Sequence, residues 1–274
     1  MTDSMELNRR SWDERAPLHA ESVDYEVEQF IAHPQHLSAV VRFDVPRLGD
    51  IRGLRTVHLQ CHIGTDTLSL ARLGAEVCGL DYSSQSLAQA RRLAERCGAK
   101  IDFVESDVYA ADQVLTPGSF DMVYTGIGAL CWLPSIEPWA RTVAALLKPG
   151  GRLFLREGHP MLLAVNEDYQ DRLVIEYPYF ERQAPLVWGS DQTYVETATP
   201  LVHTVTHEWN HGLGEVITAL LGHGLQITAL VEHDSIPWEA LPGQMSKNAQ
   251  GEWALDKERW RLPLSYTLQA MKRG

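Results

Sequence analysis

Short apolar runs alternate with amphipathic segments through the middle of the chain. The runs predict buried strands at residues 56–60, 76–80, 101–104, 120–125 and 152–156. Between them, apolar residues recur every three or four positions and predict helices at residues 65–73, 83–97 and 136–147. Strands that alternate with helices in this way indicate an α/β fold, a doubly wound and mostly parallel sheet with helices on both faces.

Two regions depart from this rhythm. Residues 1–50 read as helices, the first stopped at Pro17 and another within residues 36–48. Residues 158–209 are rich in aromatic residues, and their alternation predicts antiparallel strands at 172–177 and 201–205. A helix from Leu213 and strands at 225–231 and 264–271 follow. We therefore predict a helical lid at 1–50 and a main domain at 51–274 that carries an insertion at about 158–209.

Composition and charge restrict the classes of partner. With 45% hydrophobic and 22% charged residues, the chain is of ordinary globular composition. A net charge of −12 argues against nucleic-acid or anionic-membrane partners, which need a basic surface. Its apolar runs fall short of the ~18 residues of a membrane span, and its polar start lacks a signal-peptide pattern. The four cysteines are scattered, so we expect a reduced, cytoplasmic protein.

The segment from residue 56 to 84 contains the most informative chemistry. A predicted strand enters a turn at Gly64, and a second strand ends at Asp81, 17 residues later. An acidic residue at about this distance accepts hydrogen bonds from a ribose in doubly wound folds. The dinucleotide motif G-x-G-x-x-G would place glycines at Gln60, His62 and Thr65. Their absence disfavours NAD and FAD and fits a nucleoside cofactor without phosphates.

Five pieces of sequence now occur in a familiar order. They are VHLQCHIGTDTLSLARLGAEV, GLDYS, FVESDV, FDMVYTGIGALCWL and LLKPGGRLFL. Together they resemble the class I S-adenosylmethionine-dependent methyltransferases over about residues 54–157. The resemblance implies a seven-stranded sheet with an antiparallel last strand, S-adenosyl-L-methionine as cofactor, and methyl transfer as activity. It also implies that Asp81 holds the ribose and Asp107 the adenine amino group.

The resemblance also suggests the remaining cofactor contacts. The candidates are Gln60, Cys61, His62, Gly64, Asp81, Tyr82, Ser83, Asp107, Val108 and Thr125, with Trp12 and His19 from the lid. Gln60 and His62 replace glycines of the family, and His58 replaces its usual acidic residue. We expect Gln60 and His62 to contact the methionine part through their side chains. The simpler alternatives are that Asp81 caps the helix after Ser83 and that Asp107 caps a short helix.

A second motif, His207-Glu208-Trp209-Asn210-His211, matches the H-E-x-x-H of zinc proteases. That motif needs a helix, on which residues four apart face one metal ion. The residues before His207 alternate like a strand, and the helix is predicted to begin after His211. We therefore expect no metal site, and keep a metal-dependent hydrolase as a rival function.

Methyl transfer requires alignment of an acceptor with the methyl group and, for some acceptors, removal of a proton. His159, His207 and Glu157 are the candidate bases. The aromatic residues of the insertion predict a pocket wall for a partly apolar small molecule; they are Tyr177, Tyr179, Phe180, Trp188 and Tyr194. A satellite core or a homodimer contact is the alternative for this insertion. A protein that binds the cofactor without transferring methyl is the second rival function.

Overall fold

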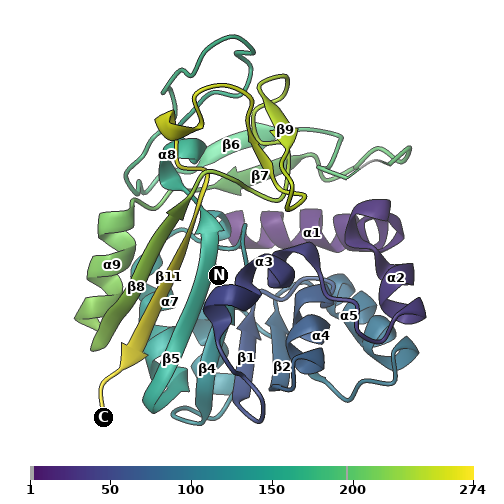
Figure 1. Cartoon of the computed structure of the whole chain (residues 1–274), viewed down its shortest axis with the longest axis vertical. Coiled ribbons are helices and arrows are strands. Elements are labelled where there is room, and N and C mark those ends of the chain that lie inside the picture. Colours follow the sequence, from purple (N-terminus) through teal and green to yellow (C-terminus); the bar gives the residue numbers. More distant parts are fainter. Residues whose placement is uncertain (1–2, 196) are drawn as a thin grey trace.

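The computed structural model describes residues 3–195 and 197–274, and it is built around a seven-stranded sheet (Figure 1). The strand order is β3-β2-β1-β4-β5-β11-β8. The strands are β1 (Arg55–Leu59), β2 (Glu76–Asp81), β3 (Asp102–Glu105), β4 (Phe120–Thr125), β5 (Leu147–Gly158), β8 (Leu225–His233) and β11 (Ser265–Lys272). The pairs from β3 to β5 are parallel, and β11 is antiparallel to both of its neighbours. This confirms the predicted doubly wound sheet.

Helices cover both faces because successive strand residues point to opposite sides. Val123 and Leu155 pack with Trp139 of α7 (Ile136–Leu146) and Leu220 of α9 (Leu213–Gly222). Their neighbours Tyr124 and Phe154 pack on the other face, with residues of α3 (Ala39–Leu48) and α4 (Thr65–Arg72). Within the predicted lid at 1–50, α3 thus belongs to the core of the main domain. The helix α5 (Ser84–Arg96) follows β2.

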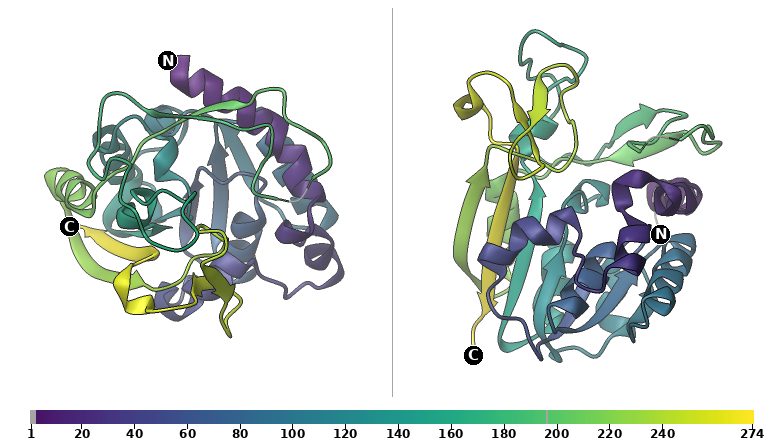
Figure 2. Two further views of the ribbon diagram at one scale, coloured as in Figure 1. Left: turned by 90° about the horizontal axis from the view of Figure 1, so that it is seen from above. Right: turned by 45° about the vertical axis from the view of Figure 1, so that its right-hand side comes forward.

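The first helix, α1 (Asp3–Glu21), runs across the edge at which the parallel strands end (Figures 1 and 2). The prediction that Pro17 ends this helix is wrong, because Pro17 lies inside it. Proline in a helix interior costs about 3 kcal/mol. Ala16 and His19 on either side are completely buried, so tertiary packing outweighs that cost. The short helices η1 (Val23–Tyr25) and α2 (Val27–Ala32) lead from α1 to α3.

The insertion contains α8 (Pro160–Leu163) and an antiparallel hairpin of β6 (Leu186–Gly189) and β7 (Val205–Glu208). The predicted strands at 172–177 and 201–205 are wrong. The first contributes one isolated bridge, between Ile175 and Val165, and only Val205 of the second enters β7. Alternation indicates a strand only where one face is buried, and Ile175 remains 64% exposed.

A second excursion, between β8 and β11, was not anticipated from the sequence. It contains β9 (Met245–Lys247), β10 (Trp253–Leu255) and η4 (Arg259–Arg261), and it lies beside α8 (Figure 1). An apolar cluster joins it to the insertion through Leu162, Val165, Ile236, Leu241, Met245, Leu255, Leu262 and Leu264. The two excursions together form a cover above the sheet edge (Figure 2). Within the described residues, no helix has the length and apolar character needed to cross a membrane.

Candidate active site

The loop after β1 adopts a conformation that normally requires glycine. Gln60, His62 and Gly64 have positive φ angles of 56°, 50° and 79°. For a residue with a side chain this left-handed conformation costs about 1–2 kcal/mol. A side chain at Gly64 would also place its Cβ 2.8 Å from the Cβ of Ala90. The loop therefore keeps a glycine-type path although two of its three special positions carry side chains.

Asp81 holds this loop from the end of β2. Its Oδ2 accepts the N–H of His62 at 2.8 Å, and its Oδ1 accepts the N–H of Ser83 at 2.8 Å. Burial raises the pKa of Asp81 to about 6, although these N–H groups act to lower it. The cap of α5 is Ser83, whose hydroxyl accepts the N–H of Ser86. The backbone N–H of Tyr82 also acts on this carboxylate, and its remaining acceptor capacity can take a hydrogen bond from the ribose.

Two buried polar atoms at the ends of β1 and β4 have no hydrogen-bond partner among the described residues. They are Oε1 of Gln60 and Oγ1 of Thr125. The amide nitrogen of Gln60 donates to the carbonyl of Ala129 at 2.8 Å, which fixes the side chain in place. Buried polar atoms without partners are uncommon in folded proteins. An orphaned acceptor at this position fits the ammonium group of the methionine part of S-adenosylmethionine.

The N-terminal helix is fastened to this loop. Asp13 accepts the hydroxyl hydrogen of Ser83 at 2.7 Å, and the ring of Trp12 contacts His62 edge-on at 5.0 Å. Nδ1 of His19 lies 2.9 Å from Nε2 of His62. Burial, with a smaller contribution from Arg15, lowers the pKa of His19 to about 3. Burial also lowers the pKa of His62, so both rings are neutral and one of them donates its N–H to the other. The other ring nitrogen of His62 contacts Ser86, so both polar atoms of this side chain are engaged within the protein.

The remaining cofactor candidates differ in how much of their side chain is already engaged within the protein. Asp107 caps η2 (Val108–Ala110) by accepting the N–H of Tyr109 at 2.9 Å, so the simpler interpretation is observed. Its other oxygen has no hydrogen bond to the described residues and could accept from an adenine amino group. Val108 is buried beside it. Tyr82 lies under the guanidinium of Arg9, at 5.9 Å. The buried Cys61 lies so close to Gly79 that a Cβ there would be 2.8 Å from its sulfur.

Two of the three predicted bases support the fold in this arrangement. The carboxylate of Glu157 accepts the N–H groups of Gly128, Ala129, Leu130 and Gly158 at 2.6–2.9 Å. It thereby anchors the loop between β4 and η3 (Leu130–Trp132). Nδ1 of His159 accepts the N–H of Met161, and its Nε2 lies 2.9 Å from Glu232. Both side chains are buried and fully engaged, so neither has a position left for an acceptor.

The third candidate, His207, belongs to the zinc-like motif. It lies on β7, where Nδ1 contacts the hydroxyl of Ser4 at 2.8 Å and the backbone pairs with Asn8. Helix α9 begins only at Leu213. The zinc motif requires two histidines one turn apart on a helix, and His207 and His211 do not have this geometry.

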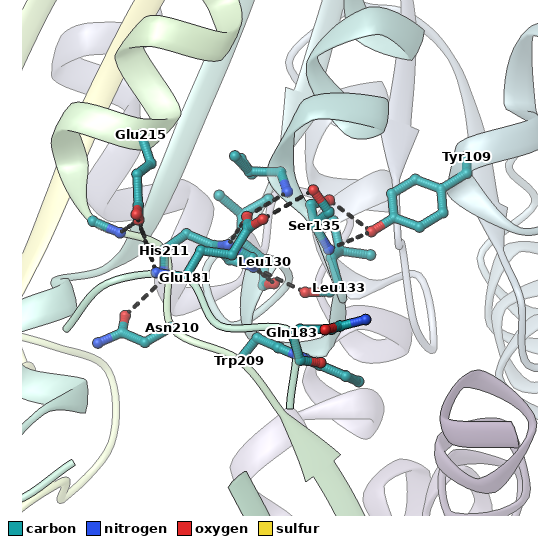
Figure 3. Close-up of polar contacts among 12 residues, drawn as sticks. Tyr109, Leu130, Leu133, Ser135, Glu181, Gln183, Trp209, Asn210, His211 and Glu215 are labelled. Carbon is teal, nitrogen blue, oxygen red and sulfur yellow. Dashed lines mark hydrogen bonds and ion pairs between the residues drawn. The ribbon is translucent and has the colours of Figure 1, made fainter. Parts of the chain in front are cut away.

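His211 instead joins the insertion to the main domain (Figure 3). Its Nδ1 lies 2.8 Å from the carboxylate of Glu181, and its Nε2 lies 3.1 and 2.9 Å from the carbonyls of Leu130 and Leu133. Both ring nitrogens of His211 therefore face oxygen atoms, one from the insertion and two from the segment before α7. The same Glu181 carboxylate also accepts from Ser135 and from the first N–H of α7.

Substitution of His211 with alanine is expected to lower the free energy of unfolding by about 1–3 kcal/mol, because its buried partners lose their donor. His207→Ala should cost less than about 1 kcal/mol, since its side chain is only half-buried. Both variants should bind S-adenosylhomocysteine like the wild type. Urea melts and titration calorimetry check these expectations. Equal stability losses, or loss of a stoichiometric bound metal from either variant, would contradict this assignment.

Two polar residues, one in the lid and one in the hairpin next to it, were not predicted as site residues from the sequence. Arg15 of α1 is 8% exposed, and Glu208 ends β7. Glu208 lies inside the H-E-x-x-H match, and assigning that segment to a strand would have placed it on the opposite face from His207.

Comparisons with known proteins agree with this geometry. A family model described as a methyltransferase domain matches residues 57–153. A ubiquinone biosynthesis O-methyltransferase from Xanthomonas euvesicatoria pv. vesicatoria is 36% identical over 125 residues, which are 44% of this chain and 51% of that protein. The chain thus spans about half the length of this curated relative.

Solved structures extend the likeness of fold beyond the matched segment. An S-adenosylmethionine dependent methyltransferase from Mesorhizobium loti has a TM-score of 0.59 and 24% identity, covering 86% of this chain and 98% of that one. A structure titled as a [4+2]-cyclase, SpnF, has a TM-score of 0.51 and 17% identity, with 85% and 80% covered. The fold therefore occurs in proteins named for different reactions. The sequence motifs and the sheet order agree with these comparisons: residues 57–153 match a methyltransferase domain, and the chain has the fold of S-adenosylmethionine-dependent methyltransferases.

Proposed function

We propose that this protein transfers the methyl group of S-adenosyl-L-methionine to a small-molecule acceptor. The observation that carries the proposal is the loop at residues 60–64, with its left-handed residues, its anchor on Asp81 and the orphaned Oε1 of Gln60. Relatives named as O-methyltransferases support transfer to oxygen. The net charge of −12 supports an acceptor that is not a nucleic acid. A cytoplasmic location and a homodimer stay predictions.

The residues around the loop at 60–64 can hold S-adenosylmethionine in place for methyl transfer. The bound cofactor supplies an activated methyl group on a sulfonium. Asp81 would hold the ribose hydroxyls, Asp107 the adenine amino group, and Gln60 the methionine ammonium. The lid excludes water, because Trp12 and His19 lie directly against His62. Water exclusion strengthens these charged contacts and protects the methyl group from hydrolysis.

The cover would supply the pocket wall that contacts the methyl acceptor. Tyr194 contacts His19 from the insertion at a ring distance of 4.6 Å, and Trp188 packs edge-on against Tyr177 at 5.0 Å. Tyr179 lies against Gly212, where an added Cβ would approach its ring to 2.8 Å. Phe180 is 70% exposed. Of the five predicted wall residues, Tyr194 is therefore the one whose ring lies against the lid, and we assign it to the acceptor side.

Titration calorimetry should detect binding of S-adenosylmethionine and S-adenosylhomocysteine and no binding of NAD at millimolar concentration. The loop at residues 60–64 lacks the glycine pattern that brings a backbone close to a pyrophosphate. Binding of NAD with no response to either methionine nucleoside would overturn the proposal.

Transfer is tested separately. Incubation with S-adenosylmethionine labelled in the methyl group and a small-molecule extract of the source organism should yield a labelled product. Cofactor binding without any labelled product would favour the second candidate, a protein that binds S-adenosylmethionine for another purpose. The likeness to a structure titled as a cyclase is the observation that keeps this candidate in the test.

A further inference from the structure

Arg15 is a buried cation without an ionic partner. It lies on the inner side of α1, donates to the hydroxyl of Ser11, and has its guanidinium carbon 5.7 Å from the ring of Trp12. No carboxylate of the described residues lies within the 4.0 Å of an ion pair. A buried charge is costly unless it is paired. None of its nitrogen atoms is among the fully buried atoms without a partner, so its remaining donors are open to solvent and a bound molecule can accept from them.

Glu208 is the corresponding acceptor without a donor. It lies on the face of β7 opposite His207, the same face as the buried Thr206. It is half-buried, and its side chain makes no hydrogen bond or ion pair with any described residue. Arg15 from α1, Glu167 from the insertion and Cys131 from η3 are the ionisable groups that act on it. Burial raises the pKa of Glu208 to about 7, although Arg15 opposes the shift.

The neighbours of both groups contact the loops that follow β1 and β4. Trp12, the neighbour of Arg15, contacts the rings of His62 and Trp132 edge-on at 5.0 and 5.1 Å. Trp209, the neighbour of Glu208, donates its backbone N–H to the carbonyl of Cys131 at 2.8 Å. The hairpin of β6 and β7 extends over α1 (Figure 2). The pair therefore stands where the lid, the cover and the loop at 60–64 meet.

We propose that Arg15 and Glu208 together bind a hydroxyl group of the methyl acceptor, with Glu208 as the base that removes its proton. This rests on the proposed function. Their two segments are hydrogen-bonded to each other, Asn8 with the backbone of His207 and Ser11 with the carbonyl of His203, yet Arg15 and Glu208 form no ion pair. A hydroxyl matches the chemistry of the two groups because it can accept from Arg15 and donate to Glu208 at once, whereas an ammonium group has no lone pair for Arg15. The tryptophans nearby favour an aromatic or other apolar frame, as in a phenol.

The step balances without another reactant. The hydroxyl oxygen forms a bond to the methyl carbon, and the electron pair of the broken carbon–sulfur bond stays on sulfur. The hydroxyl proton moves to the Glu208 carboxylate and later to water. Positive charge is lost at sulfur and negative charge at Glu208, so the net charge of the site does not change. Arg15 stabilises the negative charge that develops on oxygen.

The test uses the full chain, methyl-labelled S-adenosylmethionine and a small-molecule extract of the source organism. The label should enter a methyl ether, which resists mild alkali and releases methyl iodide in hot hydriodic acid. Glu208→Gln should reduce transfer about 100-fold or more, while the affinity for S-adenosylhomocysteine stays unchanged. Between pH 6 and 8, wild-type transfer should rise about tenfold as Glu208 ionises, and the Gln variant should lose this rise. Glu176→Gln, an exposed glutamate of the same insertion, is the matched control.

Arg15→Met should reduce transfer about tenfold or more through the loss of a hydrogen bond to its charge. A label found on nitrogen, carbon or sulfur would overturn the inference, as would normal transfer by Glu208→Gln. Loss of S-adenosylhomocysteine affinity in Arg15→Met would assign Arg15 to the cofactor site and overturn its proposed role in binding the acceptor hydroxyl. Failure of the wild type to produce any labelled compound would overturn the proposed function and this inference with it.

Discussion

Replacing Asp81 with alanine is expected to weaken S-adenosylhomocysteine binding about 10- to 1000-fold. Up to two ribose hydroxyls would lose a charged acceptor, each worth roughly 1.5–3 kcal/mol, and about 1.4 kcal/mol is a factor of ten in affinity. The variant should also lose about 1–3 kcal/mol of stability, because the N–H groups of His62 and Ser83 lose their acceptor. Calorimetry and a denaturant melt on the same variant measure the two effects.

The same carboxylate makes binding depend on pH. Because burial raises the pKa of Asp81 to about 6, lowering the pH through 6 protonates it and removes an ionised acceptor from the ribose. Affinity at pH 5 should therefore be about tenfold lower than at pH 7.5. The stability effect has the opposite sign, since a raised pKa stabilises the fold at low pH and this contribution is lost as the pH rises through 6.

Asp81→Asn is the control for the charge. It keeps the size of the side chain and should largely remove the pH dependence, although the pKa of Asp107 is also raised by burial and leaves a smaller dependence in the same direction. If Asp81→Ala lowers only the stability and leaves the dissociation constant unchanged, Asp81 serves solely as the anchor of the loop.

Replacing Glu157 with alanine is expected to lower the free energy of unfolding by about 4 kcal/mol or more. The substitution would leave four buried backbone N–H groups without their acceptor, and each unsatisfied group costs about 1–3 kcal/mol. The loop that begins at Gly128 should loosen, and with it the carbonyl of Ala129 that holds Gln60. Urea denaturation measures the stability, and calorimetry measures the accompanying loss of S-adenosylhomocysteine affinity.

The exposed Glu76 at the start of β2 provides the control. Glu76→Ala should change stability by less than about 0.5 kcal/mol. A loss below 1 kcal/mol in Glu157→Ala would mean that the loop holds its shape without this carboxylate, and it would return Glu157 to the list of candidate bases.

Local pattern was enough to predict the alternating strands and helices between residues 55 and 158. The apolar runs of β1 and β4 are buried on both faces, so these runs indicate their elements without knowledge of their partners. The order of motifs was likewise enough to suggest the methyltransferase domain that the family model matches. Asp81 follows the predicted strand at 76–80 and Asp107 lies three residues after the one at 101–104, and such strands end at one edge of a parallel sheet. Alternation before His207 was enough to disfavour a helix at the zinc-like motif, although the strand observed there, β7, begins only at Val205.

Only the tertiary structure decided what the polar residues of this edge do. Glu157 and His159 have the chemistry of bases, but contacts from distant segments engage their acceptor and donor positions. Pro17 stays helical because packing on both sides outweighs its local cost. Arg15 and Glu208 are 193 residues apart in sequence (208 − 15), and no local pattern pairs them. Side-chain chemistry is a local property and can be read from the sequence, whereas burial and partnership depend on which segments pack together.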